Sequence, residues 1–287
     1  MNSNVLLLLG VTLVWGTTFP LLKAIAVDLD GVEITAVRFV LAALCLLPFL
    51  RKTSRAVWRD GALLGGFALV SYVAQAYGLQ HISSNRSAFL TSLNVLMVPL
   101  LGFVFGRGLS WNALTAALLA CLGIGLMSWE GGGNLLGDGA TVLSALAYAL
   151  YVIFLSQRSN RHDSRQLAAT QITLMALFGC VWMVLGAQGS TALASLPTRL
   201  IPHLPALVYL GVVASAGMLF LQALAQRHVP AEKAAIVYAM EPVFAAMFGW
   251  LWLSESLGVR GACGGVLVVA AMVLSELRAA PAACPQD

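Results

Sequence analysis

Long apolar runs separated by short polar or charged segments make up most of the 287-residue chain. Windows bounded by glycine, proline or clusters of charge divide it into about ten such runs. Most are near the length of about 20 residues that a helix needs to cross a bilayer core about 30 Å thick. The pattern therefore predicts an all-α polytopic membrane protein with ten transmembrane helices, at residues 4–27, 32–50, 60–80, 84–105, 110–129, 138–157, 165–187, 203–224, 232–252 and 258–277.

The connections between these runs are mostly short. The exception is 188–202, where proline and small polar residues predict a surface loop. Residues 278–287, rich in alanine and proline, are expected to form a disordered cytoplasmic tail. The run that opens the chain has no basic flank and no small-residue cleavage site after it, so we expect it to be retained as the first span.

Composition excludes several other classes of protein. Hydrophobic residues make up 60% of the chain and charged residues 10%, whereas soluble domains carry about 25% charged residues. A soluble protein of this composition would expose large apolar patches. Basic residues do not gather with aromatic residues into the patch that nucleic-acid binding requires. The expected surroundings are therefore a lipid bilayer, with no nucleic-acid partner.

The positions of lysine and arginine favour one orientation in the membrane, because cytoplasmic loops are enriched in these residues. With the N-terminus in the cytoplasm, three basic residues, Arg86, Arg199 and Arg260, fall outside, and eleven fall inside. We therefore expect both termini to be cytoplasmic. The eleven inner residues are Arg51, Lys52, Arg55, Arg59, Arg107, Arg158, Arg161, Arg165, Arg227, Lys233 and Arg278.

The chain also divides into two halves, separated by GGGN at 131–134. A shift of 147 residues lays HISSNRSAFLTSLNVLMVPLLGFVFG onto HVPAEKAAIVYAMEPVFAAMFGWLWL and pairs Asn94 with Glu241. Five spans in each half is an odd number, so the second half must cross the membrane in the opposite sense, as in transporters built from inverted repeats. The predicted units are a first five-helix repeat at 1–130, a glycine-rich linker at 131–137 and an inverted repeat at 138–277.

The clearest candidate for function is an acid in the middle of the ninth apolar run, EKAAIVYAMEPVFAAMFGWLW. Glu241 lies nine residues past Glu232, about 14 Å along a helix and therefore near the membrane midplane. Pro242 follows it and removes a backbone N–H from the helix. An ionisable side chain at this depth should face protein or a water-filled cavity, because lipid does not stabilise its charge.

Asn94 lies at the same depth in the matching run of the first half. One hypothesis is that Glu241 and Asn94 face a single central cavity and bind a polar or cationic group. Glu241 would then exchange protons as the cavity opens and closes, because burial disfavours a charged carboxylate. The alternative is a packing role, in which Glu241 bonds to backbone left free beside Pro242 and Asn94 bonds between helices.

Amide, hydroxyl and aromatic side chains elsewhere in the apolar runs suit a cavity that binds an organic solute by stacking and a few hydrogen bonds. Tyr238 and Thr91 lie three residues before Glu241 and Asn94, on the same helix faces. The alternative for each of these side chains is packing or anchoring at the membrane surface. The candidate substrate-binding residues are Trp15, Thr18, Tyr72, Gln75, Thr91, Asn94, Tyr148, Gln222, Tyr238 and Glu241.

Two basic residues lie inside predicted spans. Arg38 is six residues into the second run, about 9 Å deep. We expect it to reach the outer surface and pair with Glu33 or Asp30, the alternative being an inward reach to a substrate carboxylate. Lys23, near the end of the first run, is interpreted in the same way. Glycines in three of the runs predict close helix packing; they are Gly65, Gly66, Gly123, Gly125, Gly261, Gly264 and Gly265.

Motifs that would indicate an enzyme or a bound cofactor are missing. The chain has no GxxxxGK[ST] phosphate-binding loop and no HExxH zinc motif, and its four histidines lie near the ends of apolar runs. We therefore expect no internal ATPase, no metal site, no bound cofactor and no catalytic activity.

Several segments, in order, carry a family resemblance. They are LLLLGVTLVWGTTFPLLKA, AVRFVLAALCLLP, GLQHISSNRSAFLTSLNVLMVPLLG, GDGATVLSALAYALYVIFLSQR and AAIVYAMEPVFAAMFGWLWLSESL. The chain resembles the EamA-type members of the drug/metabolite transporter superfamily over nearly its whole length. The resemblance implies ten helices in two inverted five-helix repeats around a central substrate cavity. It also implies a place in the bacterial cytoplasmic membrane and export of amino acids or other small metabolites.

The chain departs from the family pattern at three points. Gly31-Val32-Glu33 replaces a proline that often precedes the second span, Tyr151 stands where the sixth span often has a histidine, and Arg107 lies near a turn that usually carries glutamate. These departures leave the expected fold intact and weigh against carrying over any one substrate.

Together the observations predict a secondary transporter, an exporter of small polar, amino-acid-like metabolites that works by alternating access through a central cavity. Its expected partners are a small-molecule substrate, the lipid bilayer and, as candidate coupling ions, protons. The alternative is a membrane receptor or sensor that binds a small molecule without moving it. The sequence leaves the substrate, the coupling stoichiometry and the oligomeric state open.

Overall fold

The computed structural model describes residues 3–82, 84–106, 111–128, 134–186, 190–253 and 258–277, and every regular element in these ranges is a helix. Seven helical segments are long and apolar enough to cross a membrane. The predicted all-helical, multi-pass architecture is therefore confirmed, while the count of ten helices stays a prediction. The seven segments are Ser3–Ile25, Gly31–Leu50, Arg55–His81, Arg86–Val104, Leu135–Arg161, Ser164–Gly186 and Ala194–Ala225; shorter apolar helices cover Leu114–Leu126 and Val259–Ala271.

The elements follow one another with short connections. Before the linker they are α1 (Ser3–Gly16), α2 (Thr18–Ile25), α3 (Gly31–Leu46), η1 (Leu47–Leu50), α4 (Arg55–His81), α5 (Ser84–Ser92), α6 (Asn94–Val104) and α7 (Trp111–Ser128). After it they are α8 (Leu135–Arg158), η2 (Ser159–Arg161), α9 (Ser164–Gly186), α10 (Ser190–Leu200), η3 (Ile201–His203), α11 (Leu204–Val208), η4 (Tyr209–Gly217), α12 (Met218–Ala225), α13 (Ala231–Tyr238), α14 (Glu241–Leu253) and α15 (Val259–Leu277).

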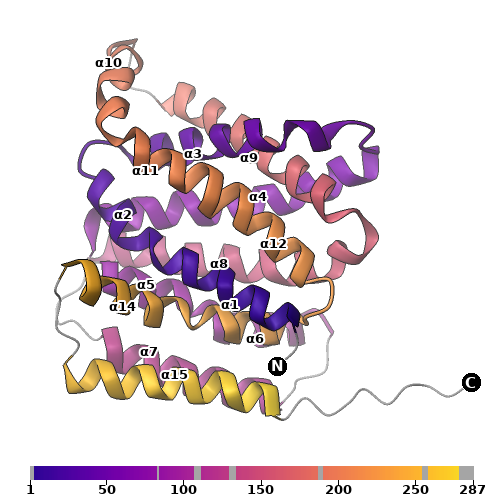
Figure 1. The fold of residues 1–287 in the computed structure, drawn as a ribbon, viewed down its shortest axis with the longest axis vertical. Coiled ribbons are helices and arrows are strands. Elements are labelled where there is room, and N and C mark those ends of the chain that lie inside the picture. Colours follow the sequence, from indigo (N-terminus) through magenta and orange to yellow (C-terminus); the bar gives the residue numbers. More distant parts are fainter. Residues whose placement is uncertain are drawn as a thin grey trace, which may run out of the picture.

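Helices from before and after the linker interleave. α4 packs along α8 and α9, α3 packs along α9, and α7 lies beside α15 at one edge of the molecule (Figure 1). α1 contacts α12, α13 and α14. Each of these contacts joins the first half of the chain to the second, so the buried core lies between the halves.

Polar side chains fix where several helices begin. The Asp30 carboxylate accepts hydrogen bonds from the backbone N–H groups of Val32 (2.8 Å) and Glu33 (2.7 Å), and Glu33 accepts one in return from the Asp30 N–H. This capping box satisfies donors that the first turn of α3 would leave unpaired. Asn134, within the predicted glycine-rich linker at 131–137, caps α8 in a similar way, so residues 135–137 form the first turn of that helix. Linker residues 131–133 lie outside the described residues.

Three expected spans are broken helices. Thr17 separates α1 from α2, Leu93 separates α5 from α6, and a turn at residues 239–240 separates α13 from α14. Pro242 lies in the first turn of α14, where its missing N–H leaves no gap in the hydrogen-bond ladder. Asn94 and Glu241 are the first residues of α6 and α14. Two of the three breaks therefore fall directly before the two positions that the 147-residue shift pairs.

Residues 188–202 were expected to form a loop, and that expectation is wrong. They contain α10 and η3, although 187–189 lie outside the described residues. Leu196 and Leu200 are four residues apart on one face of the helix and pack against the hydrophobic core. This apolar face outweighs the preference of Pro197 against a helix interior.

Two adjacent glycines of α4 meet different surroundings. A Cβ on Gly65 would lie 2.8 Å from the backbone oxygen of Gln171 in α9, whereas a Cβ on Gly66 would meet nothing within 4 Å. Gly123 similarly lets α7 approach α15, since a Cβ there would lie 2.6 Å from the oxygen of Gly264. The predicted role of glycine in close packing is thus confirmed for Gly65 and Gly123, and is wrong for Gly66.

The neighbouring glycines give a matched test of this packing. We expect Gly65→Ala to lower the midpoint of thermal unfolding of the detergent-purified protein, because the added methyl pushes α4 off the α9 backbone at a cost of about 1–3 kcal/mol. Gly66→Ala should leave the midpoint unchanged or raise it, since alanine favours a helix over glycine by about 1 kcal/mol. Equal shifts in the two variants would contradict the close α4–α9 contact.

Candidate functional site

A small polar cavity lies inside the helix bundle, among residues from both halves of the chain. Its volume is about 30 Å³, the scale of a water molecule rather than of an organic solute. α1 to α5 supply most of its wall, and α8 and α14 supply the rest. The lining residues are Trp15, Thr18, Arg38, Ser71, Tyr72, Gln75, Thr91, Tyr148 and Glu241.

The cavity is deep in the bundle. Arg38 follows the start of α3 by seven residues, and Glu241 follows the start of α13 by ten, so they lie about 11 Å and 15 Å along their helices. Tyr148 lies thirteen residues into α8. These distances place the cavity several turns from the helix ends, within the apolar part of the protein.

Glu241 is the acid on the cavity wall. It is the first residue of α14, where the partial positive charge of a helix N-terminus favours a carboxylate. The side chain is half-buried, and no hydrogen bond or ion pair joins it to any other described residue. The break between α13 and α14 thus presents an unpaired acid to the cavity.

Arg38 is the cation on the same wall. It is 3% exposed, its Nε donates to the Ser215 hydroxyl (3.0 Å), and its guanidinium carbon lies 4.8 Å from the Tyr72 ring centroid. The expected pairing with Glu33 or Asp30 is wrong: Glu33 pairs with Arg199 instead. Residues five apart on a helix do not share a face, so an Arg38 that follows Glu33 by five points elsewhere.

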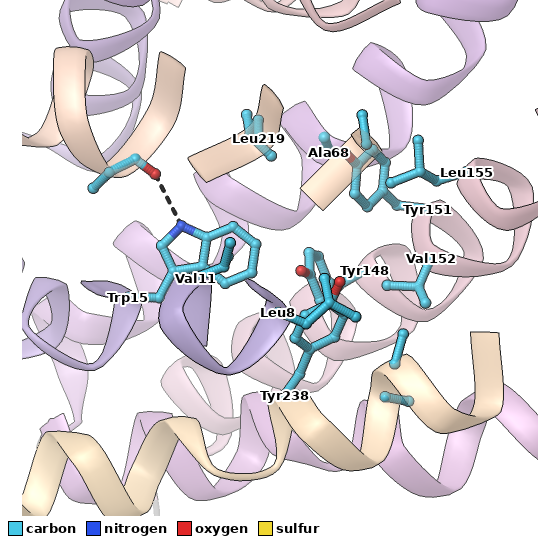
Figure 2. Packing of buried hydrophobic residues seen from close by; sticks show 14 of the residues in the cluster. Leu8, Val11, Trp15, Ala68, Tyr148, Tyr151, Val152, Leu155, Leu219 and Tyr238 are labelled. Carbon is cyan, nitrogen blue, oxygen red and sulfur yellow. Dashed lines mark hydrogen bonds between the residues drawn. The ribbon is translucent and has the colours of Figure 1, made fainter. Parts of the chain in front are cut away.

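Aromatic rings form one side of the site (Figure 2). The Trp15 indole donates to the backbone oxygen of Ala214 in η4 at 2.9 Å. Its ring centroid lies 6.1 Å from that of Tyr148 and 5.8 Å from that of Tyr238. Tyr148 also stacks on Tyr151 at 5.6 Å. Such ring pairs form a rigid part of the site and stabilise the folded protein by more than the burial of their apolar area alone.

Buried tyrosine and glutamine side chains, joined by hydrogen bonds, form a layer next to Tyr148. Gln222 donates to the Tyr148 hydroxyl (3.0 Å) and accepts from Tyr151 (3.4 Å), while Tyr238 donates to Gln226 (3.2 Å). Tyr151, Gln222, Gln226 and Tyr238 are at most 1% exposed. We name these four residues the tyrosine–glutamine layer. Gln222 and Tyr238, predicted to bind substrate, therefore lie in this layer and not on the cavity wall.

Asn94 also lies off the cavity wall, although its partner in the repeat, Glu241, lines it. Asn94 is 3% exposed, and its side-chain oxygen has no hydrogen bond among the described residues. The hydroxyl of Thr91, three residues earlier, lines the cavity and is likewise unpartnered. The remaining predicted residues lie on the wall: Trp15, Thr18, Tyr72, Gln75, Tyr148 and Glu241.

The predicted binding residues left out two wall residues, Arg38 and Ser71, and two members of the layer, Tyr151 and Gln226. Ser71 lies four residues before Gln75 and so shares its helix face; its hydroxyl is 3.1 Å from that of Ser144. Gln226 lies four residues after Gln222 and shares its face in the same way. Arg38 was considered but assigned to the surface. The four-residue spacing from Gln75 and from Gln222 is therefore the sequence signal that could have identified Ser71 and Gln226.

Ion pairs join the two halves of the chain at both ends of the bundle. At one end Arg199 binds Glu33 through two contacts of 2.5 and 2.7 Å, and Arg86 binds Asp138. At the other end the buried Asp60 accepts from Arg158 and lies 2.9 Å from His162. A third pair at the first end places His203 2.7 Å from Asp28. Each pair takes one residue from before the linker and one from after it.

Long apolar helices around a buried polar cavity define a multi-pass membrane protein. The EamA-like transporter family matches residues 2–129 and residues 135–277, and the chain belongs to this family. Two relatives from Archaeoglobus fulgidus, each named "Uncharacterized transporter", are similar to it. One is 26% identical over 269 residues, covering 93% of this chain and 84% of the relative; the other is 23% identical over 294 residues, covering 97% and 99%.

A solved crystal structure has the same fold, with a TM-score of 0.76 over 99% of each chain at 16% identity. The family match and the transporter-named relatives make the chain a membrane transporter. Among the described residues, no group of three or more histidine, cysteine or acidic side chains is placed to hold a metal ion.

Two carboxylates in the bundle allow the role of Glu241 to be tested through stability. Asp60→Asn should lower the unfolding midpoint, because it removes a partner of Arg158 and His162 at a cost of about 1–3 kcal/mol. Glu241→Gln should leave the midpoint unchanged or raise it, since the acid has no partner to lose. Thermal unfolding without added ligand measures both. A loss in Glu241→Gln as large as in Asp60→Asn would make Glu241 a packing residue.

Proposed function

We propose that this protein is a secondary transporter that exports small polar organic metabolites by alternating access through the cavity between its halves. The observation that carries the proposal is the Glu241 carboxylate, which has no partner among the described residues and lies on a polar cavity deep among apolar helices. An ionisable group inside a membrane is costly, and such groups mark substrate and ion pathways. The family supports a transporter, and no cofactor or catalytic step is part of the proposal.

Two inverted five-helix repeats, at 1–130 and 138–277, are proposed as the moving frame. The family match covers the two halves separately, which supports a duplication. Helix breaks directly before Asn94 and Glu241 also fit this arrangement, because transporters with inverted repeats place broken helices at their midplane sites.

Alternating access requires barriers that open in turn on the two sides of the cavity. The tyrosine–glutamine layer is a barrier toward the end of the bundle where α8 finishes. The ion pair between Glu33 and Arg199 ties the halves at the opposite end. An organic substrate also needs the walls to move apart, because the present cavity is about 30 Å³. Substrate binding and opening are therefore proposed to occur together.

The proposed location is the bacterial inner membrane, with both termini in the cytoplasm. Eleven basic residues fall on the inner side in this orientation and three on the outer side. The end of the bundle with Asp60, Arg158 and His162 would then be cytoplasmic. The end with Glu33 and Arg199 would face outward.

Proton exchange through Glu241 is the proposed coupling. In the closed cavity the charged form of the carboxylate loses solvation, and in the open cavity water restores it. The other charged or titratable side chains on the wall are Arg38, Tyr72 and Tyr148. A proton taken up on one side of the membrane and released on the other would link substrate movement to the pH gradient.

Transport by purified protein in liposomes tests this coupling. We expect an imposed pH gradient to increase substrate flux several-fold in the wild type and to leave flux unchanged in Glu241→Gln. Glu232→Gln is the matched control, an acid nine residues earlier that lies off the cavity wall. Equal flux in wild type and Glu241→Gln, indifferent to the gradient, would end the coupling hypothesis and leave facilitated transport. Binding without any flux would replace the transporter by a receptor.

A further inference from the structure

Arg38 has more hydrogen-bonding capacity than the protein uses. Its Nε bonds to Ser215, and its plane lies near the rings of Tyr72 and Phe39. All three partners are neutral. The two terminal nitrogens make no hydrogen bond or ion pair to another described residue, although the side chain is buried and lines the cavity. A cation deep in a membrane protein is normally paired, so the open partner position belongs to something that enters the cavity.

The chemistry of that partner follows from the guanidinium. Arginine presents two parallel N–H donors that match the two oxygens of a carboxylate, and the match is stronger than with a neutral acceptor. Ser215 and Tyr72 hold the group from the Nε side and from one face of its plane. This arrangement leaves the terminal nitrogens without a partner among the described residues, on a side chain that lines the cavity, where an anionic group of the ligand can accept from both.

Glu241 supplies the opposite charge on the same wall. No ion pair within 4.0 Å joins it to Arg38, so the two charges on the cavity wall do not neutralise each other directly. A simple cation entering this space would be repelled by Arg38, and a simple anion by Glu241. A ligand with one group of each sign neutralises both walls at once.

From this geometry we infer that Arg38 is the residue that selects for a carboxylate, and that Arg38 and Glu241 together select a small zwitterion. The inference rests on the proposed function, because it takes the cavity as the transport site. Arg38 binds the carboxylate in two-point contact, Glu241 binds the ammonium group, and Trp15 and Tyr148 contact the apolar remainder. Ser215 is a positioning residue that fixes the Arg38 plane from η4.

The position of Ser215 connects this selection to the two halves of the chain. Arg38 lies in α3, before the linker, and Ser215 lies in η4, after it. η4 is a π-helical segment, a local irregularity frequent at functional sites. A carboxylate bound by Arg38 is therefore held by both halves through one side chain.

The test uses analogues that each lack one charge. The full chain, purified in detergent, is titrated with each of the twenty standard L-amino acids, and the shift of the unfolding midpoint reports binding. For each amino acid that stabilises the protein, its amide removes the carboxylate and its N-acetyl form removes the ammonium group. We expect both analogues to bind the wild type at least about tenfold more weakly, a difference of about 1.4 kcal/mol.

Two variants separate the two recognition steps. In Arg38→Gln the acid and its amide should bind equally, while the preference for the free amine over the N-acetyl form remains. In Glu241→Gln the free amine and its N-acetyl form should bind equally, while the preference for the acid over its amide remains. Arg38→Lys should keep part of the preference for the acid, and Ser215→Ala should weaken binding less than Arg38→Gln does. A purely structural role of Arg38 would weaken all ligands alike and leave these ratios unchanged.

The inference is overturned if no amino acid stabilises the wild type or if an amide binds as tightly as its acid. Should Arg38→Gln fail to fold, the wild-type comparison and Arg38→Lys still decide. Liposome uptake separates this failure from that of the proposed function. If the wild type carries an amine without a carboxylate but no amino acid, transport stands and the role of Arg38 falls. If it carries neither, the proposed function falls with it.

Discussion

The hydrocarbon core of a membrane offers no hydrogen bonds, so each polar group of the chain needs a partner within the protein or in a water-filled space. Most of the described polar groups meet this need locally. Hydroxyls bond back to the carbonyl four residues earlier, as Thr12, Thr35 and Thr141 do. Lys23 donates to the carbonyls of Leu79 and Ile82 and so satisfies the end of α4. The bundle can therefore be apolar outside without leaving these groups unpaired.

Among the described residues several buried polar groups remain without a partner, and two charged ones lie on the cavity wall. Glu241 and the terminal nitrogens of Arg38 are unpartnered among the described residues, and both lie on the cavity wall. The helix break before α14 contributes to the same cavity, because it puts Glu241 at a helix start deep in the bundle. The helix is interrupted, and these two groups lack partners, at the place where a polar ligand could pair with them. This pattern is expected of a binding site, where function costs some stability.

The sequence predicted the membrane class and the weakened helix beside Pro242, because each depends on residues close together in the chain. It also singled out Glu241, whose role in binding stays a prediction. It failed where tertiary packing decides. The direction of Arg38 depends on Ser215, which lies 177 residues away. α10 forms because Leu196 and Leu200 find the core, a contact that local preferences of Pro197 do not reveal.

The glycines that line α4 restrict how its neighbours can move. Gly61 and Gly65 place the first part of this helix against the α9 backbone, and Gly78 places its last part against Thr141 and Gly137 of α8. A helix seated at both ends against two different partners has no room to shift along its own axis by a residue, about 1.5 Å, without driving backbone into backbone. It remains free to tilt about these contacts. In the proposed transport cycle, α4 is therefore expected to tilt about these contacts and not to slide along its own axis.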